Sequence, residues 1–503
     1  MKKIHTLINT LSGSEKRMFK LRLTNNKKDS YISKLFDIIN SQNEYNFDKI
    51  ALLGGRSPKQ TRANLTLLYD FILRFLRECD ISENVRVQCR GELMDIITLE
   101  ERGLISDAIT KARKLSDKSI ELENYEAAHD TLNELWRLLV INNTTKAEDF
   151  SEVQHLIDEV KTKIQELYNY QQVYRKVSSL YIDYFYFKRN LNAVLLVNSA
   201  LLEISQYKKS FSRAAYKHHE IQAMSYLIKE DYELALLARK TQLRIVFSSP
   251  AYQNKYIEKI HVLGHILQSF KIHFQLNQFK EYFSLFIKHL SPTITKIKDT
   301  FTIEKYHEYY LINQCFLLIT NFNFFSLTTI KSEIETAIKN KIVRNPNHLL
   351  NIYLSLIEVL IIHKQFKEAT KYFMLSFQLK DISKTGILYN NLELLFIFQK
   401  IILNDLDYAS RLITSYESKI RRHHIETSID KTIFLEFLKD LNKDKVKDLN
   451  YYIEQINVNY GFKILLKSLK QIRLKSQTSF TLEGNDNNYK RSTDVLLQNI
   501  INN

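Results

Sequence analysis

A group of polar and basic side chains near the N-terminus has the residue types that contact nucleic acid. Ser57 followed by Pro58 is typical of a helix start, in which Ser caps the helix and Pro occupies its first position. Lysine, arginine, glutamine and asparagine at the beginning of such a helix suit contacts to phosphates or base edges. The side chains in this position are Lys59, Gln60, Arg62 and Asn64.

The surrounding segment, residues 48–65, resembles a helix-turn-helix. In that motif a short helix crosses the nucleic-acid backbone, and polar residues at the start of the next helix meet base edges. The turn here is about one residue longer than the usual form, and Ser57-Pro58 is also explained by helix capping alone. Two interpretations follow, a nucleic-acid contact and a structural helical cap with a solvated polar face.

A second basic element lies near the C-terminus, between Gly461 and Lys475. It predicts an amphipathic helix with apolar residues on one face and four cations on another. Such a helix suits an acidic partner or a membrane surface, and it equally suits a terminal repeat helix with a soluble outer face. The four cations are Lys463, Lys467, Lys470 and Arg473.

The chain lacks the usual signatures of catalysis and cofactor binding. His261 and His265 stand four apart, but Val262 follows the first histidine where a general-base glutamate would be needed, and no third ligand is apparent. The sequence has no Gly-rich phosphate loop and no nucleophile elbow. These observations predict a non-enzymatic protein without a metal or cofactor.

Composition favours helices and places the excess charge at the two ends. The 503 residues are 45% hydrophobic and 12% aromatic, with 9 Gly and 4 Pro, too few for folds rich in tight turns. The net charge is +16: residues 1–90 carry 17 basic against 9 acidic side chains, residues 411–475 carry 14 against 8, and residues 91–410 are nearly balanced at 39 against 36. Basic ends can steer an acidic partner or nucleic acid.

The sequence also predicts a cytoplasmic protein without integral membrane association. Three cysteines without metal or paired spacing argue against a disulfide framework. The first apolar stretch is interrupted by polar residues and makes a poor signal peptide. No window approaches about 18 uncharged apolar residues, the length needed for a membrane span.

One turn signature recurs along the chain. An apolar or aromatic residue follows a polar break, and an alanine stands three positions later, in the pairs Ile105/Ala108, Tyr232/Ala235, Phe366/Ala369 and Leu406/Ala409. Weaker copies are Thr144/Ala147, Leu191/Val194, Phe279/Tyr282, Phe325/Thr328 and Val446/Leu449, so that consecutive copies are 39 to 47 residues apart. A period of that size predicts stacked helical hairpins in which the small alanine lets two helices approach.

Two of these turns resemble those of tetratricopeptide repeats (TPR). They are Asp231-Tyr232-Glu233-Leu234-Ala235 and Gln365-Phe366-Lys367-Glu368-Ala369, and Phe373 and Ser376 match two further positions of the pattern. The period exceeds the 34 residues of that family, and Ile357 stands where a small residue is expected. The resemblance implies an all-α fold, a right-handed superhelix (α-solenoid) of antiparallel hairpins, that binds peptides, helices or partner domains in a concave groove.

Together these patterns predict a basic N-terminal helical domain over residues 1–90, a TPR-like array over 91–475 and a polar, flexible tail over 476–503. The favoured function is a scaffold or adaptor that binds a protein or peptide partner in the groove. The alternative is a DNA-binding regulator whose N-terminal domain contacts DNA while the array senses a peptide or partner. A third alternative is an adaptor at a membrane surface.

Overall fold

In the residues that it describes, the computed structural model is built from α-helices and a short 3-10 helix. It describes residues 2–452 except 12, 25–29, 43, 81–84, 143–145, 183–190, 274, 296, 298, 322–323, 381, 383–386, 424–428 and 444–450. Across these residues there are 21 α-helices and no strand. The all-α class predicted from the sequence is therefore confirmed.

The chain divides into two compact units, Met1–Ile164 and Gln165–Asn503. The division falls inside the long helix α9, Ala147–Ile182. The boundaries predicted at residues 90 and 475 stay predictions, and the predicted tail lies outside the described residues.

The first unit contains eight helices before α9. They are α1 (Lys2–Thr10), α2 (Gly13–Thr24), α3 (Ser30–Asn40), α4 (Phe47–Gly54), α5 (Pro58–Asp80), α6 (Val85–Glu101), α7 (Ile105–Glu121) and α8 (Tyr125–Ile141). Helices α1 to α5 share one apolar core. At its centre the Phe19 ring of α2 lies 5.1 Å from the Phe36 ring of α3 and 5.3 Å from the Phe75 ring of α5. This core fixes α4 and α5 relative to each other.

The second unit continues after α9 with helices that pair along the chain. They are α10 (Leu191–Ser205), α11 (Ser212–Ile228), α12 (Tyr232–Ser248), α13 (Tyr256–Ile272), α14 (Leu276–Ile294), α15 (Thr300–Asn321), α16 (Phe324–Lys339), α17 (Pro346–Ile362), α18 (Phe366–Phe377), α19 (Ile387–Ile402), α20 (Leu406–His423) and α21 (Ile429–Asn442). The short 3-10 helix η3 (Pro250–Tyr252) connects α12 to α13.

The same tight turn joins several consecutive helices in both units. One residue of each turn has a positive φ: Gly103 (75°), Glu123 (52°), Glu230 (61°), Lys364 (60°) and Asn404 (59°). The following residue donates its N–H to the carbonyl five positions back, as Asp231 does to Tyr226 at 2.9 Å and Gln365 to Leu360 at 2.8 Å. This is the Schellman arrangement, which ends one helix and lets the next begin two residues later.

The alanines of the turn signature are buried in the paired helices. Ala108, Ala369 and Ala409 are completely buried, and Ala235 is 2% exposed. The apolar residue three positions before each alanine is more accessible: Ile105, Tyr232 and Phe366 are half-buried, and Leu406 is exposed. The small side chain therefore stands where the sequence predicted close helix packing.

The structure also corrects the positions of some weaker copies. Helix α14 begins at Leu276, so Phe279 takes the buried place that alanine has elsewhere, and the predicted Phe279/Tyr282 pair is three residues out of register. A further copy, Tyr125/Ala128, begins α8 and was missed because it follows Ile105 by only 20 residues, half the hairpin period.

Proline usually interrupts a helix, so Pro292 in the sequence suggests a connection between two hairpins, but the structure shows that this interpretation is wrong. Pro292 lies inside α14, in its last turn, whereas Pro250 and Pro346 do begin helical segments. Only two helical residues follow Pro292 in α14, so the hydrogen bond that this proline cannot donate is lost close to the end of the helix. The connection between α14 and α15 instead follows Ile294.

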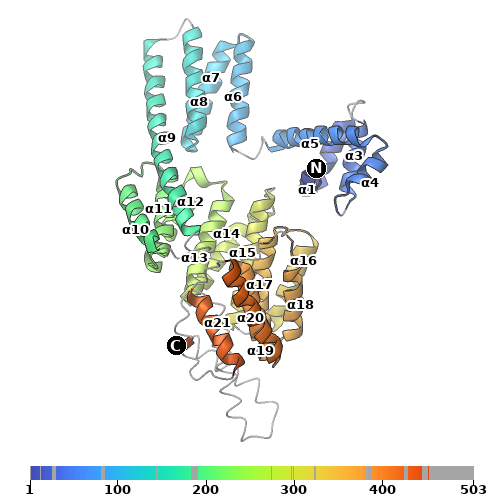
Figure 1. Cartoon of the computed structure of the whole chain (residues 1–503). Coiled ribbons are helices and arrows are strands. Elements are labelled where there is room, and N and C mark those ends of the chain that lie inside the picture. Colours follow the sequence, from blue (N-terminus) through green and yellow to red (C-terminus); the bar gives the residue numbers. More distant parts are fainter. Residues whose placement is uncertain are drawn as a thin grey trace. The chain divides into compact units, whose positions relative to one another are not determined.

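The second unit places the first helices of successive hairpins next to one another. We call α11, α13, α15, α17 and α19 the first helices, and α12, α14, α16, α18 and α20 the second helices. Contacts run from α13 to α15, from α15 to α17, from α17 to α19 and from α19 to α21. Figure 1 shows α15 and α17 running alongside each other, with α16 and α18 beside them. The first helices from α13 to α19 therefore form a continuous layer, which α21 extends.

Candidate interaction sites

The helix-turn-helix-like segment of the first unit consists of α4, a short turn and α5. Gly55 ends α4 with a φ of 72°, and its N–H donates to the carbonyls of Ala51 and Leu52 at 3.2 and 3.3 Å. At the start of α5, the backbone N–H of Gln60 donates to Ser57 Oγ at 3.4 Å, and the N–H of Ser57 donates to Gln60 Oε1 at 3.3 Å. This reciprocal pair is a capping box, which confirms Ser57 as the helix cap.

The four side chains predicted to contact nucleic acid lie on the first turns of α5. Lys59, Gln60 and Arg62 are exposed, and Asn64 is half-buried. The Asn64 amide donates to the Gln60 carbonyl at 2.7 Å, and the Arg62 guanidinium lies 5.1 Å from the centre of the Phe47 ring. Capping and local hydrogen bonds thus account for Gln60 and Asn64, while Lys59 and Arg62 present cations at the helix start.

The second predicted basic surface cannot be placed. Lys463, Lys467, Lys470 and Arg473 lie outside the described residues. The repeat-turn residues, in contrast, lie at the hairpin turns and have the structural positions given above.

A row of polar side chains crosses the first helices of the second unit. We call it the polar band: Lys217 and Glu220 on α11, His261 and His265 on α13, Lys305 and Glu308 on α15, and His348 and Asn351 on α17. The sequence alone does not predict the polar band, and only the spacing of His261 and His265 draws attention to any of its residues. The band forms only because the hairpins bring distant segments together.

Hydrogen bonds connect members of the polar band within and between helices. Lys217 Nζ donates to Glu220 Oε2 at 2.6 Å. Glu308 receives Lys305 Nζ at 2.8 Å on one carboxylate oxygen and the Asn351 amide of α17 at 2.9 Å on the other. Because each carboxylate has a cationic or amide donor, the band is electrostatically satisfied before any partner binds.

Burial and neighbouring charges determine the protonation of the two α13 histidines. Burial lowers the pKa of His261, and Lys305 and Arg239 lower it further against the opposing effect of Glu220 and Glu308. Burial also holds the pKa of His265 well below its usual value. Both imidazoles are therefore neutral near pH 7. Among the described residues, no group of three histidine, cysteine or acidic side chains is placed to hold a metal ion.

Glu304 fixes the start of α17 at the edge of the band. Its Oε1 accepts the backbone N–H groups of Arg344, at 2.6 Å, and of Asn345, while His348 Nδ1 lies 3.4 Å away. Burial raises the pKa of Glu304, but His348 and the two N–H donors outweigh that effect and hold the pKa below its ordinary value. The ionised carboxylate thereby links α15 to α17.

Two charged residues lie within the apolar layer between the first helices. Lys271 is buried at the end of α13, with its ammonium 5.4 Å from the Phe316 ring, and burial lowers its pKa. Glu358 of α17 is half-buried, and burial raises its pKa. Sequence reasoning missed both, although each interrupts an apolar run. Their environment favours neutral forms, which is consistent with packing in a core.

Compared with known proteins, the chain matches no protein-family model, and a search of curated protein sequences finds no match. Among the described residues, no helix combines the length and the apolar character needed to cross a lipid bilayer. The TPR resemblance and the partner class stay predictions.

Proposed function

We propose that this chain is a non-enzymatic helical-repeat scaffold that binds a protein or peptide partner along the layer of first helices. Its hairpins form a TPR-like right-handed superhelix, and the polar band faces the partner. The observation that carries the proposal is the polar band itself, which spans four first helices. Six of its eight side chains are half-buried, and the other two, Glu308 and His348, are buried.

The repeated turn supports the array. Five turns place a residue of positive φ at the same position. A buried alanine follows five residues later in each of them, at Ala108, Ala128, Ala235, Ala369 and Ala409. Equivalent turns orient successive hairpins alike, and hairpins that contact only their neighbours build an extended surface rather than one closed core.

The chemistry of the band supports a polypeptide partner. Lysines, glutamates and an asparagine alternate along it, so a partner would meet both donors and acceptors. Hydrogen bonds within α11 and α15, and one from α17 to α15, already fix their orientations. A preorganised surface loses little side-chain entropy when it binds. The band suits an extended peptide or a helix that carries charges of both signs.

The proposal is tested by affinity purification of the full chain from native cells, followed by mass spectrometry. We expect the original chain to recover a partner reproducibly. The variant Lys305→Gln, which changes the polar band, should recover less of that partner. The matched control is Lys331→Gln on α16: Lys331 pairs with Glu368 at 2.9 Å and is 22% exposed, and Lys305 pairs with Glu308 at 2.8 Å and is 21% exposed. No partner, or equal recovery by both variants, would contradict the proposal.

DNA binding through α4 and α5 is a second candidate function. The capping box fixes the start of α5, and Lys59 and Arg62 are exposed there within a region that carries 17 basic against 9 acidic side chains. Cations at a fixed helix start are suited to phosphate contacts in the manner of a helix-turn-helix.

Binding of duplex DNA over a range of salt concentrations tests this second function. Each lost phosphate contact should reduce the slope of log affinity against log salt by about 0.9. We expect Lys59→Gln with Arg62→Gln to weaken binding, while Lys367→Gln, an exposed lysine at the second position of α18, leaves it unchanged. Absence of binding by the full chain at low salt would exclude the function.

A further inference from the structure

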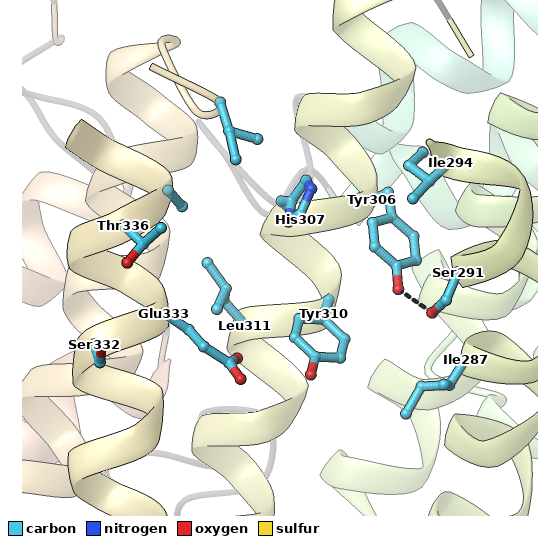
Figure 2. Close-up of a pocket in the computed structure, with 12 residues that line it drawn as sticks. Ile287, Ser291, Ile294, Tyr306, His307, Tyr310, Leu311, Ser332, Glu333 and Thr336 are labelled. Atoms are coloured by element: carbon cyan, nitrogen blue, oxygen red, sulfur yellow. Dashed lines mark hydrogen bonds between the residues drawn. The ribbon is translucent and has the colours of Figure 1, made fainter. Parts of the chain in front are cut away.

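A pocket lies on the side of the second helices, away from the polar band. It has a volume of about 430 Å³ and 12 lining residues. Figure 2 shows α15 between α16 and α14, with side chains of all three helices turned into the space between them. This volume is within the range of about 300–1,000 Å³ that is usual for small-ligand sites.

Glu333 of α16 is the acidic residue of this pocket, and its charge has no counterpart there. The side chain is half-buried, and its Oε2 is buried without a hydrogen-bond partner among the described residues. No lysine or arginine is among the lining residues. Lys331, two residues earlier on α16, is instead paired with Glu368 of α18 at 2.9 Å. The pocket therefore presents an unpaired carboxyl group in a chain that is otherwise strongly basic.

Tyrosine rings form the wall opposite Glu333. Tyr306 and Tyr310 of α15 stack with ring centres 5.9 Å apart and an interplanar angle of 13°. A hydrogen bond between the hydroxyls of Tyr306 and Ser291 of α14 fixes the first ring. In Figure 2 the Glu333 carboxylate reaches from α16 toward Tyr310, and the electrostatic effect of Glu333 on the pKa of Tyr310 agrees with this proximity.

The remaining titratable side chain of the pocket adds no positive charge near neutral pH. Burial lowers the pKa of His307, so its imidazole is neutral at pH 7. Burial raises the pKa of Glu333, because nothing in the pocket stabilises the ionised carboxylate. A ligand that carries a positive charge would supply the missing partner.

We propose that this pocket binds an organic cation, a primary ammonium or a guanidinium group, which pairs with the Glu333 carboxylate while its alkyl stem packs against Tyr306 and Tyr310. A carboxylate supplies the charge-assisted hydrogen bonds, and an aromatic ring attracts a cation that lies over its face. The cation comes either from a free small molecule or from a lysine or arginine side chain of a partner. The site is separate from the polar band and does not depend on it.

Calorimetry with the full chain tests the proposal with three probes. They are agmatine, the peptide acetyl-Gly-Arg-Gly-amide, and the same peptide with neutral citrulline in place of arginine. We expect saturable binding of at least one of the two cationic probes and about tenfold weaker binding of the citrulline peptide, which keeps the shape and loses the charge. Agmatine binding as tightly as the arginine peptide identifies a free cation as the ligand, and much tighter peptide binding identifies a partner side chain.

Two substitutions and one control assign binding to this pocket. Glu333→Gln should weaken binding of the cationic probe about tenfold, and Tyr310→Leu should weaken it severalfold while leaving the carboxylate in place. Glu335→Gln, two residues further along α16, should leave it unchanged, since Glu335 is 54% exposed and pairs with Lys371. Equal binding of arginine and citrulline peptides, no saturable binding of either cation, or full affinity in Glu333→Gln would overturn the proposal.

Discussion

Two glutamates on either side of the hairpin array have opposite environments. Glu304, next to the polar band, accepts two backbone N–H groups and lies beside His348, and its pKa is lowered. Glu333, in the pocket beside the second helices, has a buried oxygen without a partner, and its pKa is raised. The Glu304 carboxylate is thus satisfied within the chain, whereas the Glu333 carboxylate has a buried oxygen that still lacks a partner. A satisfied surface suits recognition by shape and charge pattern, and an unsatisfied pocket suits a specific ligand.

Disrupting the hairpin that supports both sides should have the largest effect. Ala369 is completely buried where α18 packs on α17, so Ala369→Leu would insert a larger side chain into a closed space. We expect a loss of about 1–3 kcal/mol in the free energy of unfolding, measured by chemical denaturation. Ala63→Leu on the exposed face of α5 is the control and should change the free energy by less than about 0.5 kcal/mol. Comparable effects at both alanines would contradict the close packing.

Removing the charge of Glu304 should destabilise the first-helix side. Glu304→Gln keeps an acceptor oxygen but loses the charge, which should lower the free energy of unfolding by about 1–2 kcal/mol at pH 7. Because the folded-state pKa lies below the ordinary value of 4.5, the carboxylate stabilises the protein above that value and loses its contribution as pH falls through the folded pKa. Denaturation of both proteins between pH 7 and pH 3 should show the difference shrinking in acid.

The same substitution at Glu333 should change the free energy of unfolding in the opposite direction. Its folded-state pKa is raised, so ionisation at neutral pH weakens folding, and stability increases as pH falls through the folded pKa toward 4.5. Glu333→Gln should therefore raise the free energy of unfolding by up to about 1 kcal/mol at pH 7. Comparing the two proteins separates Glu333 from the other titratable groups of the pocket, Tyr306, His307 and Tyr310. A destabilised Glu333→Gln protein would mean that the carboxylate already has a partner.

Substitutions at the turns between paired helices should change the free energy of unfolding by a smaller amount. Lys364 has a φ of 60°, which costs a residue with a side chain about 1–2 kcal/mol and glycine much less. Because glycine also loses more freedom on folding, Lys364→Gly should stabilise the chain by only about 0.5 kcal/mol. Gly103→Ala, at the equivalent turn of α6 and α7, should destabilise it by about 1 kcal/mol. Thermal denaturation of both variants tests whether the turns are equivalent.

Local signals in the sequence account for the helices and several turns, and long-range contacts account for the rest. Ser57-Pro58 marks the start of α5, and the alanine of each strong pair marks close helix packing, because both depend on neighbouring residues. The start of α14 was misplaced because Phe279 occupies the position of an alanine. Hydrophobic periodicity alone does not show whether a large side chain such as Phe279 occupies the buried position of the alanine or the position three residues before it.

The polar band and the pocket were beyond such reasoning. Glu308 and Asn351 are 43 residues apart in sequence, and only the packing of α15 on α17 brings their side chains within 2.9 Å. Glu333 looks like an ordinary surface glutamate on an amphipathic helix, since nothing near it in sequence indicates that Tyr306 and Tyr310 lie opposite. Both sites depend on how hairpins pair, which the spacing of turns predicts only in outline.

The central claim, partner binding along the first helices, is tested most directly by the dissociation constant of the recovered partner with two variants of the chain. Lys305→Gln changes the polar band, and Lys331→Gln changes a lysine of nearly equal exposure and pairing on a second helix. The account predicts about fivefold to tenfold weaker binding for Lys305→Gln, equivalent to about 1–1.4 kcal/mol, and no change for Lys331→Gln. Equal affinities for the two variants, or a loss confined to Lys331→Gln, would contradict it.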